Sequence, residues 1–312
     1  MSQKRYKSEE IIHKLRVAEV ESSKGHNTGQ ICRKLGITEQ TYYRWRKQYG
    51  GMKVEQAKRY KELESDKARN SKRMYTDYPY NKFGYDRTRL SSKFLDLLID
   101  VKDKKNKNVY DIGCGGGYWF DVYEKQGFSK ENIVGLDQST SAVKIIKEKG
   151  YTVYEGDALN LPFADEVSDI TICNGVIHHT VDSRKAFSEL CRITKNGGEI
   201  MVSVYNIWHP YYFFVHKLSF PLRYAYWNIT KSVFPPVYLL TYGIIQITSL
   251  LIYLRLQKHY DVKRLLMDEV FNPVVELFSL RKLKRYGVSS GLTFITGGYY
   301  FFNSMLYARF TK

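Results

Sequence analysis

Apolar residues in the first fifty positions recur at helical spacing and predict three short helices. The first helix ends at Gly25, Thr28 is expected to cap the second, and Thr38 is expected to cap a third over Glu39–Tyr49. The apolar stripes of the first and third helices are Ile11, Ile12, Leu15 and Ala18, and Tyr42, Trp45 and Tyr49. Because a Gly-Ile-Thr turn joins the second and third helices, the pattern predicts a helix-turn-helix.

Beyond residue 108 the pattern changes to short apolar runs that alternate with helical stretches. The runs predict strands over 109–112, 132–136, 152–155, 168–173 and 199–205. This alternation is typical of a doubly wound parallel sheet, so the predicted fold class is α/β with a small all-α domain in front. Near the end, a helix over 272–286 and a hairpin of strands 289–296 and 299–310, turning at Gly297-Gly298, complete the sheet.

The charge is concentrated at the two ends of the chain. The net charge is +17, and residues 1–73 hold 19 Lys and Arg against 9 Asp and Glu, whereas residues 207–312 hold 13 against 4. The near-neutral middle between two basic ends indicates segments with different partners; solubility alone is the other explanation.

The cysteines and the first residues exclude several classes of protein. The four cysteines have no CxxC spacing, which argues against a zinc ribbon, an iron–sulfur site or a disulfide scaffold, so no metal site is predicted. The first residues are polar and basic and lack the apolar core of a secretory signal. A cytoplasmic location is therefore expected.

A glycine cluster follows the first strand of the middle region and has an acid in front of it. The cluster holds Gly113, Gly115 and Gly117, and glycine permits positive φ and a close approach of the backbone to a ligand. The spacing departs from the dinucleotide motif GxGxxG because residue 118 is Tyr, and Asp111 would repel a pyrophosphate. An acid at this place suits a cationic ligand, such as the amino group and sulfonium of S-adenosylmethionine.

Polar residues also follow the next three predicted strands. Asp137 ends the second strand 24 residues after Gly113, close to the offset of roughly 20 residues at which an acid meets ribose hydroxyls. Asp157 follows the third strand and Asn174 follows the fourth. The carboxyl edge of the sheet is therefore predicted to be the site.

Five blocks in order, VYDIGCGGGYW, VGLDQS, EGDALNLPFADEVSD, NGVIHH and ELCRITKNGGEIMVSV, lie within residues 88–206. Together they resemble the class I S-adenosylmethionine-dependent methyltransferases, in the branch of quinone and sterol C-methylating enzymes. The resemblance implies a Rossmann-like seven-stranded sheet with an antiparallel seventh strand, and S-adenosylmethionine as cofactor. The residues implied to contact the cofactor are Asp111, Gly113, Gly115, Gly117, Asp137, Asp157, Ala158 and Asn174.

The resemblance also implies a role for each of these residues. The glycines would line the methionine part, Asp111 would face its amino group and Asp137 would hold both ribose hydroxyls. Asp157 would accept from the adenine amino group, the Ala158 N–H would meet the ring, and Asn174 would contribute a backbone contact near the methionine.

No catalytic residue is determined by the sequence, because methyl transfer from a sulfonium mainly requires alignment and exclusion of water. The weak candidates are His178, His179, His209 and Tyr211. Asn174 is followed by Gly-Val-Ile, not by the Pro-Pro-aromatic motif of amino-methylating DNA enzymes. Enzymes that methylate cytosine at C5 use a cysteine that follows a proline, and none of the seven prolines here precedes a cysteine. Both features argue against a nucleobase acceptor.

The stretch QICRKLGITEQTYYRWRKQYGGM resembles the helix-turn-helix domain of the helper protein of insertion-sequence transposases, over about residues 3–70. The resemblance implies DNA contacts by Gln40, Tyr43, Arg44 and Lys47. The chain departs from that family after the motif, since only Leu63 stands where a leucine zipper would continue. An inherited fusion fragment without a present role is the alternative interpretation.

The expected domains are the helix-turn-helix over 1–70, a tyrosine-rich linker or lid over 71–87, the cofactor-binding core over 88–206, an apolar cap over 207–268, and the closing helix and hairpin over 269–312. Residues 232–254 carry no charge, but prolines and polar residues dilute them. The cap is expected to lie on a membrane surface or to receive a lipid-like substrate; a buried cap over a soluble substrate and a true span are the alternatives.

The sequence thus predicts an S-adenosylmethionine-dependent methyltransferase that acts on a small-molecule or lipid-like acceptor and carries a DNA-binding domain. The alternative is a transposase-derived, sequence-specific DNA-binding protein with an inert methyltransferase domain. Peripheral membrane contact through the cap would add membrane association to the cytoplasmic location.

Overall fold

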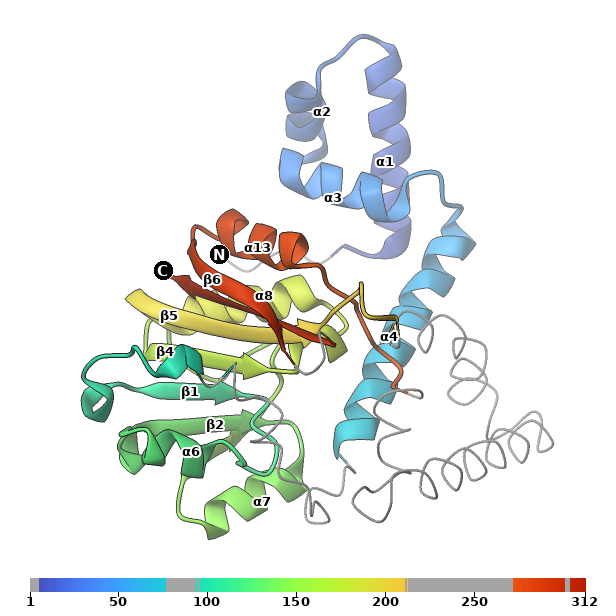
Figure 1. Ribbon diagram of the computed structural model, residues 1–312. Coiled ribbons are helices and arrows are strands. Elements are labelled where there is room, and N and C mark those ends of the chain that lie inside the picture. The colour runs from blue at the N-terminus through green and yellow to red at the C-terminus, as the bar shows by residue number, and fades with distance from the viewer. Residues whose placement is uncertain (1–5, 77–93, 95, 211, 213–271, 301–303) are drawn as a thin grey trace, which may run out of the picture. The chain divides into compact units, whose positions relative to one another are not determined.

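The computed structural model describes residues 6–76, 94, 96–210, 212, 272–300 and 304–312, which fall into two units, Met1–Lys67 and Ala68–Lys312 (Figure 1). The predicted lid from residue 77, Tyr211 and the predicted cap from residue 213 lie outside these ranges. Among the helices of the described ranges, none has both the length and the apolar character that crossing a membrane requires.

The first unit contains three helices and the start of a fourth. Their bounds are α1 (Ser8–Ser23), α2 (Thr28–Leu35), α3 (Glu39–Tyr49) and α4 (Val54–Thr76). The predicted apolar stripes form its core, in which Ile12, Leu15 and Trp45 are buried together with Ile31 from α2. Gly36 ends α2 in the left-handed conformation, with φ of 64°, which allows the tight turn into α3.

The caps of the two short helices differ from the prediction at one position. Thr38 caps α3 as expected, and its hydroxyl accepts the N–H of Thr41 at 3.1 Å. The cap of α2 is Asn27 and not Thr28, which is the first residue of the helix. Asn27 accepts the N–H of Gln30 at 2.9 Å and the Gln30 side chain accepts the N–H of Asn27 at 3.0 Å, a reciprocal pair that Thr28 cannot form.

Helix α4 continues past the predicted domain boundary at residue 70 and ends at Thr76. Its last turns carry Ser71 and Met74, both buried in the second unit. Burial of these side chains explains why the helix does not stop at the polar stretch after Leu63.

The second unit is built on one seven-stranded sheet in the order β3-β2-β1-β4-β5-β7-β6 (Figure 1). Strands β1 to β5 are parallel, and β7 is antiparallel to both β5 and β6. The bounds are β1 (Val109–Ile112), β2 (Ile133–Asp137), β3 (Thr152–Glu155), β4 (Ser168–Asn174), β5 (Thr194–Tyr205), β6 (Thr293–Tyr300) and β7 (Met305–Thr311). The predicted doubly wound sheet with an antiparallel seventh strand is confirmed.

The helices cover the sheet through two apolar clusters. One cluster contains side chains of α8 (Ser183–Ile193) and α13 (Leu280–Ser289), and the other contains side chains of α6 (Phe120–Lys125) and α7 (Thr140–Glu148). Short 3-10 helices complete the described elements: η3 (Asp96–Leu98), η4 (Lys104–Asn106), η5 (Lys130–Asn132) and η6 (Ile177–His179). The strand order reverses between β1 and β4, and sheets of this type bind ligands at such a point.

The closing helix and hairpin are placed differently from the prediction. Helix α13 begins at Leu280, not at residue 272, and Gly297 and Gly298 lie inside β6, opposite Ala308 and Tyr307. A Cβ on Gly297 would lie 2.8 Å from the Tyr307 carbonyl oxygen. These glycines therefore allow close packing between two strands and do not form the turn.

Candidate functional site

The two acids predicted to bind the cofactor lie at the carboxyl ends of two neighbouring parallel strands. Asp111 is the third residue of β1 and pairs in register with Gly135 of β2, and Asp137 is the last residue of β2. Both side chains are buried, with 1% and 5% of the residue surface exposed. The structure thus brings together two acids that stand 26 positions apart, at the edge where the strand order reverses.

The glycine loop between them has the predicted backbone conformation. Gly113, Gly115 and Gly117 have φ values of 79°, 53° and 70°. A Cβ on Gly113 would lie 2.3 Å from Cγ2 of Val176, and one on Gly117 would lie 2.9 Å from Cγ1 of Ile146. Two of the three glycines are therefore required by packing within the protein as well as by φ.

Asp137 fastens this loop to the end of β2. Its Oδ2 accepts the N–H of Gly115 at 2.8 Å and its Oδ1 accepts the N–H of Ser139 at 2.9 Å. The Asp137 carboxylate is thus oriented by the backbone on both sides, and each oxygen keeps acceptor capacity for a further donor such as a hydroxyl.

The electrostatics of the pair favour a positively charged ligand. Burial raises the pKa of Asp111 to about 7, against a hydrogen bond from Tyr123 that lowers it, and the nearby charge of Asp137 raises it further. Burial likewise raises the pKa of Asp137 to about 6, against the N–H groups of Ser139 and Gly115. Within the described residues, no basic side chain forms an ion pair with either acid. A cation beside them would stabilise their ionised forms, so the residues fit S-adenosylmethionine.

Asp157 and Ala158 begin the segment that follows β3. The N–H of Gly156 donates to the carbonyl of Asp137 at 3.0 Å, which joins this segment to the end of β2. Asp157 is exposed and its Oδ1 accepts the N–H of Leu159 at 2.9 Å, whereas Ala158 is buried. The three predicted acids therefore follow one edge of the sheet, across β1, β2 and β3.

Asn174 ends β4 and is held by two side chains that the sequence did not indicate. Its Oδ1 accepts from the hydroxyl of Ser203 on β5 and from that of Tyr300 on β6, the latter at 3.1 Å. The side chain of Asn174 thus links three strands, which leaves its backbone to make the predicted contact.

Tyr123 is a further site residue that sequence reasoning missed. Its hydroxyl donates to Oδ2 of Asp111 at 3.0 Å from helix α6, and its ring is fully buried. Nothing in the sequence pattern indicated that this hydroxyl would reach an acid twelve positions earlier in the chain.

The histidine candidates lie in or near the 3-10 helix η6, and both His178 and His179 are buried. The His178 ring lies 4.0 Å from the ring of Tyr205. Nδ1 of His179 lies 2.8 Å from the amide nitrogen of Asn272 and 3.2 Å from the carbonyl of Val274, so this ring fixes the chain that enters the closing helix.

His209 packs beside Tyr212 at a ring distance of 5.7 Å, near the end of β5. These contacts assign the histidines packing roles, and their predicted part in catalysis stays a prediction. Tyr211 lies outside the described residues.

In the first unit, the predicted DNA-contacting side chains share the solvent face of α3. Gln40, Tyr43, Arg44 and Lys47 are exposed, whereas Trp45 between them is buried. The helix therefore presents two cations, an amide and a phenol on one side, which suits phosphates and base edges in a major groove.

Two family models match the chain, one for each unit. The model described as a methyltransferase domain matches residues 110–202, and the model described as a transposase matches residues 1–75. The resemblances predicted from the motifs are confirmed by these matches.

Several curated proteins and solved structures are similar to the second unit. The tRNA (carboxymethyluridine(34)-5-O)-methyltransferase of Arabidopsis thaliana is 35% identical over 100 residues, which cover 31% of this chain and 24% of the relative. The demethylmenaquinone methyltransferase of Paenarthrobacter aurescens is 31% identical over 117 residues, which cover 36% of this chain and 44% of the relative. An S-adenosylmethionine-dependent methyltransferase structure from Mesorhizobium loti superposes with a TM-score of 0.47 at 12% identity and covers 73% of this chain and 99% of its own.

The aligned part of the chain spans less than half the length of these two curated relatives. The matched segment nevertheless contains the glycine loop, both buried acids and Asp157, and S-adenosylmethionine is the cofactor of such domains. The chain therefore contains a methyltransferase domain of the S-adenosylmethionine-dependent kind, joined to an amino-terminal segment of the transposase helix-turn-helix family.

Proposed function

We propose that this protein transfers a methyl group from S-adenosylmethionine to a small-molecule or lipid-like acceptor. The observation that carries the proposal is the pair of buried acids, Asp111 and Asp137, at the point where the strand order reverses. The similarity to a demethylmenaquinone methyltransferase supports an acceptor of the quinone kind.

The residues of the chain would bind and orient the donor. When bound, S-adenosylmethionine supplies a methyl group on a positively charged sulfur. Asp111 would offset the charge of the methionine end, and Asp137 would hold the ribose while its backbone contacts keep the glycine loop in place. Binding and orientation of the donor for transfer of its methyl group to the acceptor are the contributions that these residues would make.

The test is incubation of the full chain with methyl-tritiated S-adenosylmethionine and a reduced naphthoquinone, a lipid extract or total tRNA. We expect label and a mass gain of one CH₂ in the quinone or lipid fraction, at a rate that Asp137→Asn lowers by about 100-fold or more, since two charge-assisted hydrogen bonds are lost. Lack of turnover in all three fractions, by protein that binds DNA, would favour the transposase-derived DNA-binding protein with an inert domain.

RNA is a second candidate acceptor, favoured by the charge of helix α13. This helix carries Arg281, Lys282, Lys284 and Arg285 and no acid. Arg184 of the neighbouring α8 lies 5.0 Å from the ring of Tyr286 on α13 and adds a further cation. Since one relative methylates tRNA by its name, label in the tRNA fraction instead of the lipid fraction would select this acceptor.

We also propose that the first unit binds DNA through α3. Arg44→Ala is expected to lower the affinity for a duplex at least about fivefold and to reduce the salt slope by about one, because it removes a contact worth about 1–3 kcal/mol. Gel shifts with random-sequence and genomic duplexes over a range of salt concentrations measure both.

The matched control is Arg16→Ala, which removes the same charge from an exposed position on α1. An equal loss of affinity in both variants would mean that charge alone, and not the face of α3, governs binding. Wild-type protein that binds no duplex at low salt would support the inherited fragment without a role.

A further inference from the structure

The segment between β3 and β4, residues 156–167, contains neither helix nor strand, yet it starts with the residues implied to read adenine. Its own hydrogen bonds are few: the N–H of Asn160 donates to the carbonyl of Asp157 at 3.0 Å, and Leu159 donates to the Asp157 side chain. Apart from the N–H of Gly156, which donates to the Asp137 carbonyl, the position of Asp157 and Ala158 therefore depends on what holds the rest of the segment.

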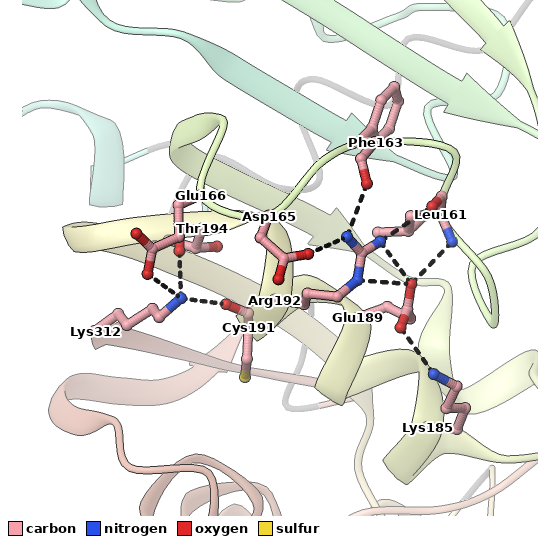
Figure 2. Close-up of polar contacts among 10 residues, drawn as sticks. All are labelled: Leu161, Phe163, Asp165, Glu166, Lys185, Glu189, Cys191, Arg192, Thr194 and Lys312. Atoms are coloured by element: carbon pink, nitrogen blue, oxygen red, sulfur yellow. Dashed lines mark hydrogen bonds and ion pairs between the residues drawn. The ribbon is translucent and has the colours of Figure 1, made fainter. Parts of the chain in front are cut away.

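Two side chains from the last turns of α8 hold it, as Figure 2 shows. Arg192 donates through Nη2 to the carbonyl of Leu161 at 3.0 Å and through Nη1 to the carbonyl of Phe163 at 2.7 Å. Nη1 also donates to Oδ1 of Asp165 at 2.8 Å. One guanidinium thus fixes three points of the segment.

Glu189 completes the attachment. Its Oε2 accepts from Nη2 of Arg192 at 2.9 Å and from the N–H of Leu161 at 3.0 Å, while Lys185 donates to Oε1 at 2.8 Å. Both backbone groups of Leu161 are therefore bound to this pair. Burial would raise the pKa of Glu189, but the hydrogen bonds from Arg192, Lys185 and Leu161 bring it below its ordinary value, so the charge is retained.

The anchored residues are also packed into the core. Leu161 and Ala158 are buried in the same apolar cluster as α8. The ring of Phe163 packs edge-on against Tyr110 of β1 at 4.9 Å. The polar pair consequently sets the path of the backbone at Leu161, and a displacement of Leu161 would also displace Ala158, which lies three positions earlier in the chain.

We propose that Arg192 and Glu189 are positioning residues that hold Asp157 and Ala158 where they recognise the adenine base. This inference rests on the proposed function, because it deepens the description of the same cofactor site. Without Arg192, two carbonyls lose their donor and a buried carboxylate loses its main partner, so the segment relaxes toward solvent.

The first measurement needs no ligand. Hydrogen exchange of the amides of residues 158–163 is compared in the full-length wild type and Arg192→Met. We expect exchange at Leu161 to accelerate at least about tenfold, the change for about 1.4 kcal/mol of lost protection. Unchanged exchange in this segment would overturn the positioning role, whatever the protein binds.

The second measurement reads the adenine directly. It compares the dissociation constants of S-adenosylhomocysteine and of S-inosylhomocysteine, in which a carbonyl oxygen replaces the adenine amino group. We expect the wild type to prefer the adenine compound by about tenfold or more, and Arg192→Met to retain less than about a threefold preference, since one hydrogen bond to a charged group is lost. Arg192→Lys keeps the charge but cannot span both carbonyls, so an intermediate preference is expected.

The matched control is Arg309→Met. Arg309 of β7 also holds a carboxylate and a carbonyl through its guanidinium, with Nε and Nη2 at 2.7 and 2.8 Å from Glu199 and Nη1 at 2.9 Å from the Leu97 carbonyl. It has the same kind of contacts but none to residues 156–167 among those described, so this variant is expected to lose stability and to keep the adenine preference.

Failure of the adenine inference and failure of the proposed function give different results. A preference that survives in Arg192→Met while exchange rises would overturn the link to adenine, and an equal loss in Arg309→Met would show that destabilisation alone is responsible. Wild-type protein that binds neither compound would overturn the proposed function, while the exchange experiment would still decide whether Arg192 positions the segment.

Discussion

Asp137→Asn is expected to lower the affinity for S-adenosylhomocysteine by about 100-fold or more. The carboxylate accepts the N–H groups of Gly115 and Ser139, and the proposed ribose contacts use its remaining acceptor capacity. An amide in its place turns an NH₂ toward one of these N–H groups. Loss of two hydrogen bonds to a charged group, each worth about 1.5–3 kcal/mol, accounts for the expected effect.

Titration calorimetry on folded protein measures this loss, and Asp169→Asn is the control. Asp169 is also an acid on a strand of the sheet, but it lies at the amino end of β4, away from the carboxyl end at which Asp137 stands. Lys195 donates to it at 2.9 Å. The control is expected to bind within about twofold of the wild type. Equal affinities of Asp137→Asn and the wild type would mean that the ribose is not held at the end of β2.

The second large effect concerns stability. Gly113→Ala is expected to destabilise the protein by about 2–5 kcal/mol, because a left-handed φ of 79° costs an alanine about 1–2 kcal/mol and the clash with Val176 adds about 1–3 kcal/mol. The free energy of unfolding from urea titrations measures the change. Binding of the cofactor is expected to fall as well, because the clash with Val176 would displace the glycine loop that contains residue 113.

Gly197→Ala separates the two causes. Gly197 has nearly the same φ, 78°, but a Cβ there meets no atom within 4 Å, so only the backbone cost of about 1–2 kcal/mol is expected. Val176→Ala in the background of Gly113→Ala should restore part of the stability by removing the two methyl groups nearest to the new Cβ. Equal losses in the Gly113 and Gly197 variants, or no rescue, would contradict a role for packing at Gly113.

Much of the fold could be predicted from sequence because local patterns determine local structure. The bounds of α3 and the burial of Trp45 follow from helical spacing and a threonine cap. The glycine loop with an acid on either side indicated the candidate site, and the sheet places these residues at one edge because parallel strands bring their carboxyl ends together.

Other features could not be predicted because their partners are distant in sequence. Gly297-Gly298 has the composition of a turn, but the close approach of β7 places both glycines inside a strand. The cap of α2 is different, because its partners are near neighbours: the reciprocal hydrogen bonds between Asn27 and Gln30, three positions apart, select Asn27 instead of Thr28.

By itself, the sequence determined the helix-turn-helix, the alternation that makes a doubly wound sheet, and the order of acids and glycines along its edge. Only the tertiary structure decided which groups act on those residues: the hydroxyl of Tyr123 on Asp111, the packing of Val176 against Gly113, and the hold of Arg192 on a segment about thirty positions away. The physical reason is that periodicity and turn chemistry act between near neighbours, whereas burial and hydrogen bonds across the core depend on how the elements pack.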